Sequence, residues 1–464
     1  MADAEKGIIA LKKLDISRED DYDILLKKVE SLYIEKTVTE ELKSRIGLKC
    51  KIILIEFPYR DKDFSSTYSG YHTKKHKSIT KECYRLHFFS DKNVSKDSYK
   101  GFLVLRPSYV SRHRGRACIS PELLTDSRTY CMLAEYPVHI FGEEYVARSY
   151  PWMSQETDIA VCAHVAVWSI SRYLSEKFHF YREYTMYDIT EMVPISLRRK
   201  VPSEGLYIHQ IAETILNIGA HPFLLQKKAD QSKFIGNVFS YVESGIPIIG
   251  AMTRKEHAVA IIGHGEINYA LLNNLKGDYI YSYELIDSLV VCDDNHLPYT
   301  EIKKTANNGY TFDDLDYAIV PLYEKMFLDA EIVRGRAENM LKSKVIDLPA
   351  PLVLRVYMTS SKSLKEKVRN DRSMESNLTK RILCTPMPKF VWCVDISTKN
   401  DFMLSKMSGK IIIDITAGTY ELNPWILYHD LSKVVYYNTA TDRFMKETLP
   451  IKPYNIYKNN LREV

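Results

Sequence analysis

The sequence predicts an α+β protein with more than one domain. A chain of 464 residues is too long for one ordinary hydrophobic core, so two or three domains are expected. In the middle third, amphipathic helical patterns come first and short apolar runs follow, which is the order of an α+β layout. Hydrophobic residues make up 45% and charged residues 27% of the chain, as is typical of globular proteins.

The first domain is expected to cover residues 1–149 and to mix helices with strands. A charged helical pattern covers residues 20–36. Runs of β-branched and aromatic residues predict three strands, because such side chains suit a pleated surface. These strands are residues 51–57, 84–89 and 101–107. The polar, basic segment 60–82 predicts a long surface loop.

The second domain is expected to cover residues 150–325, with its helices before its sheet. One helix begins near Cys162, and two more end near glycines, which favour the left-handed backbone that stops a helix. These two helices are residues 205–219 and 233–244. Apolar runs then predict the strands of an antiparallel sheet. They are residues 246–252, 257–267 and 289–293.

The third domain is expected to cover residues 326–464, after a strand at residues 318–323. A helix is predicted at residues 327–344, and a charged helical segment at 359–383 lies between strands. The predicted strands are residues 352–358, 389–397 and 410–418. This domain is therefore also a mixture of helices and strands.

The charge and the cysteines argue against several classes of protein. A net charge of +5 is small for this length and makes no strong case for nucleic acid or an anionic membrane as a partner. Residues 1–20 lack the apolar core of a signal peptide, and no run approaches the roughly 20 apolar residues of a membrane span. The eight cysteines stand singly, without a C-x-x-C pair, so we expect reduced thiols in a cytoplasmic protein with no metal and no cofactor.

The stretch 154-SQETDIAVCAHVAVWSI-170 places Cys162 at the start of an apolar helix. One interpretation is that Cys162 only packs, because buried cysteines often behave as small hydrophobic side chains. The other is that Cys162 is a nucleophile, because a helix N-terminus and a neighbouring protonated histidine favour a thiolate. Gln155 would then donate to the oxyanion that forms on a substrate. A base and an orienting acid elsewhere in the chain would favour the second interpretation.

His257 is the candidate base. It is the first polar residue of an apolar strand, and a strand end can meet a helix N-terminus at the edge of a sheet. His164 lies about 200° round the helix from Cys162, so we interpret it as structural. His264 is turned to the opposite face of the predicted strand by period-two alternation.

Asp293 is the candidate acid that orients His257. The stretch 289-LVVCDDNHLPY-299 ends an apolar run in two acids, and Asp293 is the first residue past the predicted strand. A carboxylate there would hold the imidazole tautomer and stabilise the imidazolium. Asp294 and Asn295 are the alternatives for this role. The same Asp-Asp-Asn sequence also suits a plain turn.

The order of Gln155, Cys162, His257 and Asp293 resembles that of the papain-like cysteine peptidases. The most similar branch is the bacterial one that includes the double-glycine leader peptidases of bacteriocin exporters. The family's Gln, Cys, His and Asp match these four residues in this order. The resemblance covers roughly residues 150–325 and implies a core of N-terminal helices plus an antiparallel sheet, with additional mixed α/β flanking domains.

Other stretches add to the resemblance, and two features depart from it. Residues 101–107 and 151–168 are similar to uncharacterised bacterial proteins with an embedded papain-like domain, and residues 205–219 resemble the second helix of the branch. The family commonly has Cys-Gly where this chain has Cys162-Ala163. Residues 268–288 form an insertion between His257 and Asp293.

The resemblance implies a cysteine hydrolase, in particular a peptidase that cleaves a peptide or amide bond through an acyl-thioester on Cys162. A transferase or deamidase is an alternative, because an amine can intercept the same acyl-thioester. A non-catalytic binding protein on a peptidase scaffold is another. A nucleic-acid binder using 112-RHRGR-116 and 197-LRRK-200 is disfavoured, since these clusters are short and lack an aromatic platform. The expected partners are a protein or peptide substrate and a regulatory protein, with no membrane.

Overall fold

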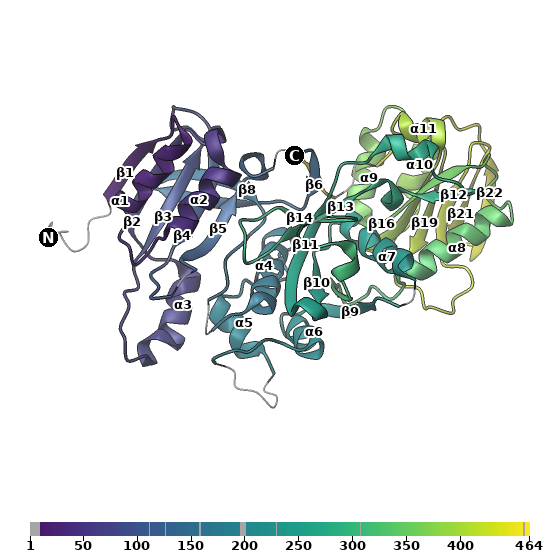
Figure 1. The fold of residues 1–464 in the computed structure, drawn as a ribbon. Coiled ribbons are helices and arrows are strands. Elements are labelled where there is room, and N and C mark those ends of the chain that lie inside the picture. The colour runs from purple at the N-terminus through teal and green to yellow at the C-terminus, as the bar shows by residue number, and fades with distance from the viewer. Residues whose placement is uncertain are drawn as a thin grey trace.

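The computed structural model describes residues 10–110, 112–125, 127–156, 159–194, 201–228, 230–306, 308–457 and 460–464. Helices and largely antiparallel sheets are mixed along this described chain, so the predicted α+β class is confirmed. Figure 1 shows three sheets side by side, with the N-terminal strands at one end of the molecule and the later strands at the other. Within the described ranges, no helix has both the length and the apolar character needed to cross a bilayer.

The first sheet has five antiparallel strands in the order β1-β2-β3-β4-β5. Its strands are β1 (Ala10–Asp15), β2 (Ile52–Tyr59), β3 (Cys83–Phe89), β4 (Tyr99–Leu105) and β5 (Arg114–Ile119). The helices of this region are α1 (Leu25–Lys28), α2 (Lys36–Arg45) and α3 (Lys62–Gly70). The strands predicted at 51–57, 84–89 and 101–107 are confirmed as β2, β3 and β4, whose side chains are mostly buried.

Two predictions for this region are wrong. Residues 20–36 do not form one helix, because a 3-10 turn and the four-residue α1 end at Val29, whose backbone is extended with φ −114° and ψ 137°. Residues 60–82 are not simply a surface loop, because they contain α3. Asp61 caps this helix by accepting a hydrogen bond from the backbone N–H of Phe64 at 3.0 Å. Only a few residues of α3 are apolar, so the spacing of apolar residues does not indicate a helix there.

The middle sheet has the main order β14-β13-β11-β10-β15-β9, and β6 pairs with both β11 and β24. Its strands are β6 (Thr129–Cys131), β9 (His221–Gln226), β10 (Ile248–Met252), β11 (His257–Gly265), β13 (Ser288–Cys292), β14 (Thr300–Lys303), β15 (Tyr317–Leu322) and β24 (Arg462–Glu463). The helices of this part are α4 (Cys162–Lys177), α5 (Met186–Met192), α6 (Ile208–Asn217) and α7 (Gln231–Glu243). Both α4 and α7 contact β11. The helices and strands predicted for residues 162–293 are confirmed, with ends shifted by a few residues.

The third sheet has the order β12-β16-β17-β19-β20-β21-β22. Its strands are β12 (Tyr279–Tyr281), β16 (Leu352–Ser360), β17 (Phe390–Thr398), β19 (Gly409–Asp414), β20 (Trp425–His429), β21 (Lys433–Asn438) and β22 (Arg443–Thr448). The helices are α8 (Ala330–Lys342), α9 (Ser361–Asn370), α10 (Ser376–Cys384) and α11 (Lys399–Met403). The strands β7 (Ala134–Ile140) and β8 (Glu143–Ser149) form a separate hairpin, and β18 (Lys406–Met407) pairs with β23 (Tyr454–Asn455). The predicted helical segment 359–383 is thus two helices, α9 and α10.

Three strands pair with strands on the other side of a predicted domain boundary. The domain boundaries themselves stay a prediction. β6 precedes residue 149, yet it pairs with β11 of the middle sheet. β12 lies inside the 268–288 insertion and pairs in parallel with β16 of the third sheet. β24 pairs with β6, so the C-terminal residues lie beside the middle sheet (Figure 1). The three predicted domains are therefore tied to one another by backbone hydrogen bonds.

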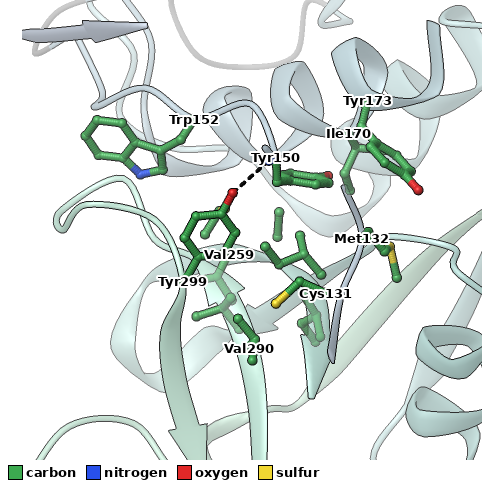
Figure 2. Packing of buried hydrophobic residues seen from close by; sticks show 14 of the residues in the cluster. Cys131, Met132, Tyr150, Trp152, Ile170, Tyr173, Val259, Val290 and Tyr299 are labelled. Carbon is green, nitrogen blue, oxygen red and sulfur yellow. Dashed lines mark hydrogen bonds between the residues drawn. The ribbon is translucent and has the colours of Figure 1, made fainter. Parts of the chain in front are cut away.

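A buried cluster joins the middle sheet to α4 and to the segment before it. Figure 2 shows Tyr150 and Trp152 packed near Tyr299, above residues of the sheet such as Val259. The hydroxyl of Tyr299 accepts a hydrogen bond from the backbone N–H of Tyr150 at 2.8 Å and donates one to the carbonyl oxygen of Ile119 at 3.1 Å. Tyr299 is only 3% exposed, so this hydroxyl satisfies two backbone groups that water does not reach.

We predict that Tyr299→Phe destabilises the protein by about 1–3 kcal/mol, because it leaves the buried N–H of Tyr150 without its acceptor. The measurement is the urea concentration at the midpoint of unfolding. Tyr420→Phe is the matched control, because the side chain of Tyr420 is 95% exposed and the same atom is removed. Equal midpoints for the two variants would contradict the role given to the Tyr299 hydroxyl.

Candidate active site

Cys162 is the first residue of α4 and is the partly exposed thiol at a helix N-terminus. The preceding residue, Val161, has an extended backbone with φ −93° and ψ 176°, so the helix begins abruptly at Cys162. The side chain of Cys162 is half-buried. Most of the remaining cysteines are buried, and Cys384 is exposed. A helix N-terminus carries partial positive charge, which favours an anionic side chain at this position.

Two of the histidines near this region are structural, as their contacts indicate. His164 is 2% exposed, and its Nδ1 accepts a hydrogen bond from the backbone N–H of Val161 at 3.3 Å. Burial lowers the pKa of His164 to about 4, so it is a neutral residue that caps α4. His264 is 1% exposed and its Nε2 lies 3.2 Å from Glu243 of α7. These contacts agree with the prediction that neither residue is the base.

The structure brings His257 together with both of its predicted partners. His257 is the first residue of β11 and lies opposite Met252 of β10. Its Nε2 is 3.0 Å from Oδ1 of Asp293, which directly follows β13. Cys162 is close enough to the same imidazole to be among the groups that raise the pKa of His257. Cys162, His257 and Asp293 therefore form one group in space, as the sequence predicted.

The pKa values of His257 and Asp293 favour a charged pair. Burial alone would lower the pKa of His257, but the hydrogen bonds with Asp293 and Cys162 outweigh it and raise the pKa to about 10. Burial would raise the pKa of Asp293, but the hydrogen bond from His257 and the backbone N–H of Asn295 at 2.9 Å hold it below its usual range. At neutral pH the imidazole is therefore protonated and the carboxylate is ionised.

Asp294 and Asn295, the alternatives to Asp293, have other contacts. Asp294 is 2% exposed, and its Oδ1 is 4.0 Å from Nε2 of His257, too far for a hydrogen bond. Burial and the neighbouring charge of Asp293 raise the pKa of Asp294 to about 6. The side-chain oxygen of Asn295 accepts a hydrogen bond from Arg112 at 3.1 Å. Asp293 is therefore the residue that orients His257.

Two aromatic residues that the sequence did not single out complete the surroundings of the pair. The ring of Tyr310 stacks on His257, with centroids 5.5 Å apart and an interplanar angle of 26°. The indole Nε1 of Trp152 donates to the backbone carbonyl of Asp293 at 2.6 Å. Tyr310 covers one face of the imidazole, and Trp152 fixes the backbone that carries the carboxylate. Tyr310 follows a glycine in a polar stretch, where no local pattern marks a functional residue.

Residues of the N-terminal third hold the loop that follows Asp293. Arg45 of α2 donates to the carbonyl oxygens of Leu297 at 3.1 Å and Pro298 at 2.9 Å. Glu41 of the same helix accepts from the backbone N–H of Leu297 at 2.6 Å. Arg114 of β5 donates to the carbonyl oxygen of Asn295 at 3.0 Å. The candidate site thus depends on side chains that lie outside the predicted peptidase segment.

These contacts also explain the basic cluster at residues 112–116. Arg112 lies 3.6 Å from Asp294, Arg114 pairs with Glu41, and Arg116 lies 3.1 Å from Asp61. The three arginines therefore neutralise carboxylates of the protein itself, which disfavours this cluster as a nucleic-acid surface. The second basic cluster, at residues 197–200, lies outside the described residues.

Gln155 is anchored by two arginines. Its backbone carbonyl accepts a hydrogen bond from Nη2 of Arg106 at 2.6 Å. Its side-chain oxygen accepts from Nη1 of Arg112 at 2.6 Å, since a guanidinium has only donors to offer and the amide oxygen must face it. Donation from the Gln155 amide to an oxyanion beside Cys162 stays a prediction.

His257, Asp293 and Asp294 also have the composition of a cation site. One ligand atom from each lies within 4.8 Å of the others. Metal ligation requires a neutral imidazole with a free lone pair. The pKa of His257, raised to about 10, keeps the ring protonated instead. A cation at this position would therefore have to displace the proton of His257.

Comparison of the chain with protein-family models, with curated proteins and with solved structures gives no match.

We predict that Asp294→Asn makes the protein more stable than the wild type at pH 7 and changes its stability little at pH 4. The pKa of Asp294 is about 6 in the folded protein and 3.8 ordinarily, so its favourable contribution is complete below pH 3.8 and is lost as the pH rises through 6. Removing the charge should raise the free energy of unfolding at pH 7 by up to about 3 kcal/mol, with little change at pH 4. Urea unfolding at both pH values measures this. Asp287→Asn is the control, because Asp287 is exposed. The same pH profile for both variants would contradict the prediction.

Proposed function

We propose that this protein is a cysteine hydrolase that cleaves a peptide or amide bond through an acyl-thioester on Cys162. The observation that carries the proposal is the position of His257, which contacts Asp293 at 3.0 Å and interacts with Cys162 on the same ring. A thiol nucleophile needs a neighbouring base, and the base needs a group that orients it. Here His257 is the base, and Asp293 is the group that orients it.

The proposed reaction begins with the thiolate of Cys162 and the imidazolium of His257. The sulfur attacks the carbonyl carbon, and the negative charge moves to the carbonyl oxygen, where the backbone N–H of Cys162 and the amide of Gln155 donate to it. The imidazolium gives its proton to the leaving nitrogen and the C–N bond breaks. Neutral His257 then takes a proton from water, which attacks the thioester, and the C–S bond breaks to release the acid. Because Asp293 occupies Nε2, Nδ1 is the nitrogen that transfers these protons.

The proposal includes a papain-like core for residues of the middle sheet and α4. It is supported by α4, which carries Cys162 and packs on β11, the strand that begins with His257. The insertion at residues 268–288 does not separate β11 from β13, because the two strands pair with Ala260 opposite Cys292. The neighbouring strand therefore still delivers Asp293 to His257, despite the long gap in sequence.

The proposed substrate is a protein or peptide. The same residues could also transfer the acyl group from the thioester to an amine. Attack by an amine instead of water makes the enzyme a transferase, with identical chemistry up to that step. Product analysis with a labelled acyl donor distinguishes the two, because hydrolysis gives only the free acid. A transfer product formed in the presence of added amine at the expense of the acid identifies the transferase.

We predict that limiting iodoacetamide at pH 6 alkylates Cys162 before every other cysteine. Ordinary thiols with a pKa near 8.5 are almost fully protonated at this pH, whereas a thiolate paired with His257 reacts. His257→Ala should abolish the preference. Mass spectrometry of the labelled peptides gives the order of modification.

Two internal comparisons make this test decisive. Cys384 is exposed, so it reports the reactivity of an accessible thiol without the pair. His139→Ala removes a histidine whose side chain is 63% exposed on the β7–β8 hairpin, and it should leave the labelling unchanged. If Cys384 is modified first, or if Cys162 reacts equally fast without His257, the catalytic assignment falls.

We predict that Gln155→Ala slows acylation of Cys162 and leaves its alkylation intact. Loss of one oxyanion donor typically costs about 10²- to 10³-fold in rate, while iodoacetamide reacts by displacement and forms no oxyanion. The acylation rate is the burst of p-nitrophenol from p-nitrophenyl acetate. An equal loss in both reactions would mean that Gln155 supports the fold rather than the reaction.

A further inference from the structure

Arg112 lies between two parts of the candidate site that come from distant stretches of the chain. On one side its guanidinium donates to the side-chain oxygen of Gln155, from Nη1 at 2.6 Å, from Nη2 at 2.5 Å and from Nε at 3.2 Å. On the other side Nη1 donates to Oδ1 of Asn295 at 3.1 Å and lies 3.6 Å from a carboxylate oxygen of Asp294. One side chain therefore connects the proposed oxyanion donor with the loop that carries Asp293.

The contact fixes which end of the Gln155 amide is available to a substrate. A guanidinium presents several N–H donors in one plane and no acceptor, so it holds the amide oxygen. The three contacts to that oxygen restrict rotation of the amide about its last side-chain bond. The amide nitrogen, the group that can donate to an oxyanion, must then face away from Arg112.

Arg112 is held in place by its own backbone as well as by its side chain. Its φ is 83°, a left-handed conformation that is rare for a residue with a side chain. The backbone N–H donates to Glu35 at 3.4 Å, and the carbonyl oxygen accepts from Arg106 at 3.3 Å. Arg106 also donates to the backbone carbonyl of Gln155 at 2.6 Å. Arg106, Arg112 and Gln155 thus form a frame in which both the backbone and the amide of Gln155 are fixed.

We propose that Arg112 is a positioning residue of the hydrolase, which holds the Gln155 amide so that its nitrogen donates to the oxyanion. The proposal rests on the function proposed above. Arg112 lies between β4 and β5, so the N-terminal sheet supplies an active-site component. The competing explanation is that Arg112 only neutralises Asp294 and supports the loop that follows it. The two roles differ in which reaction of Cys162 they affect.

The test uses two probes that both react at Cys162. Acylation by p-nitrophenyl acetate passes through an oxyanion, whereas alkylation by iodoacetamide does not. Arg112→Ala should slow acylation by about 10²-fold, because a displaced donor loses most of its effect, and should leave the alkylation rate unchanged. Arg148→Ala is the matched control, since Arg148 lies on the β7–β8 hairpin with a side chain that is 69% exposed. It should change neither rate.

Three further measurements distinguish a positioning role of Arg112 from general support of the fold. Arg112→Lys should remain slow in acylation, because one ammonium nitrogen cannot replace the three guanidinium nitrogens that contact the amide oxygen. Ethylguanidinium added to Arg112→Ala should restore part of the acylation rate, because the side chain of Arg112 is 28% exposed and its space is open to solvent. The double variant Arg112→Ala/Gln155→Ala should acylate no more slowly than Gln155→Ala alone, since both changes remove the same donor.

Each remaining outcome overturns the proposal in a recognisable way. Equal loss of acylation and alkylation in Arg112→Ala means that Arg112 supports His257 and Asp293. Losses that multiply in the double variant mean that Arg112 does not act through Gln155. Failure of the function itself is visible earlier, with Arg112 and Gln155 intact, as alkylation of Cys162 that is equally fast in the wild-type protein and in His257→Ala. That result removes both proposals, while the first two remove only the role of Arg112.

Discussion

The contact between His257 and Asp293 is the interaction on which the candidate site depends. It joins the first residue of β11 to the residue just past β13, so it exists only because these two strands are neighbours in the sheet. The contact keeps a buried imidazole protonated, and it holds one ring nitrogen so that the other is left for Cys162. Removing either partner would leave a buried charge without its counterpart, which is costly in any protein interior.

The candidate site also requires that the loop after Asp293 keeps its shape. Side chains of the N-terminal third of the chain hold this loop. Arg45 and Glu41 bind the backbone of residues 297–298, and Arg114 binds the carbonyl oxygen of Asn295. Backbone groups of a loop that bond to fixed side chains lose conformational freedom before any substrate arrives. The helix α2 and the strand β5 thus act as a support for a carboxylate that lies about 250 and about 180 residues later in the chain, respectively.

The sequence was sufficient for the parts of the site that follow from local pattern. Cys162 stands before a continuous apolar helix, His257 opens an apolar strand, and Asp293 closes one, so each could be predicted from its neighbours. Arg112 and Tyr310 could not, because their partners lie about 40 to 180 residues away in sequence and neither sits in a periodic segment. The same reason explains α3, which is buried by contacts from elsewhere in the chain. Local pattern predicts elements, whereas long-range contacts decide which polar residues lie beside the candidate site.

The pairing of β24 with β6 has a consequence for the order of folding during synthesis. β6 is bonded to β11 on one side and to β24 on the other, with Val464 and Thr129 exchanging backbone hydrogen bonds at 2.9 and 3.2 Å. β24 is translated after every other strand of this sheet, so a nascent chain can assemble β11 and β13 while one edge of β6 is still bare. An unpaired strand edge is a template for pairing with other chains. Until residues 462–463 leave the ribosome, the growing polypeptide therefore carries an aggregation-prone edge one strand away from the strand of His257.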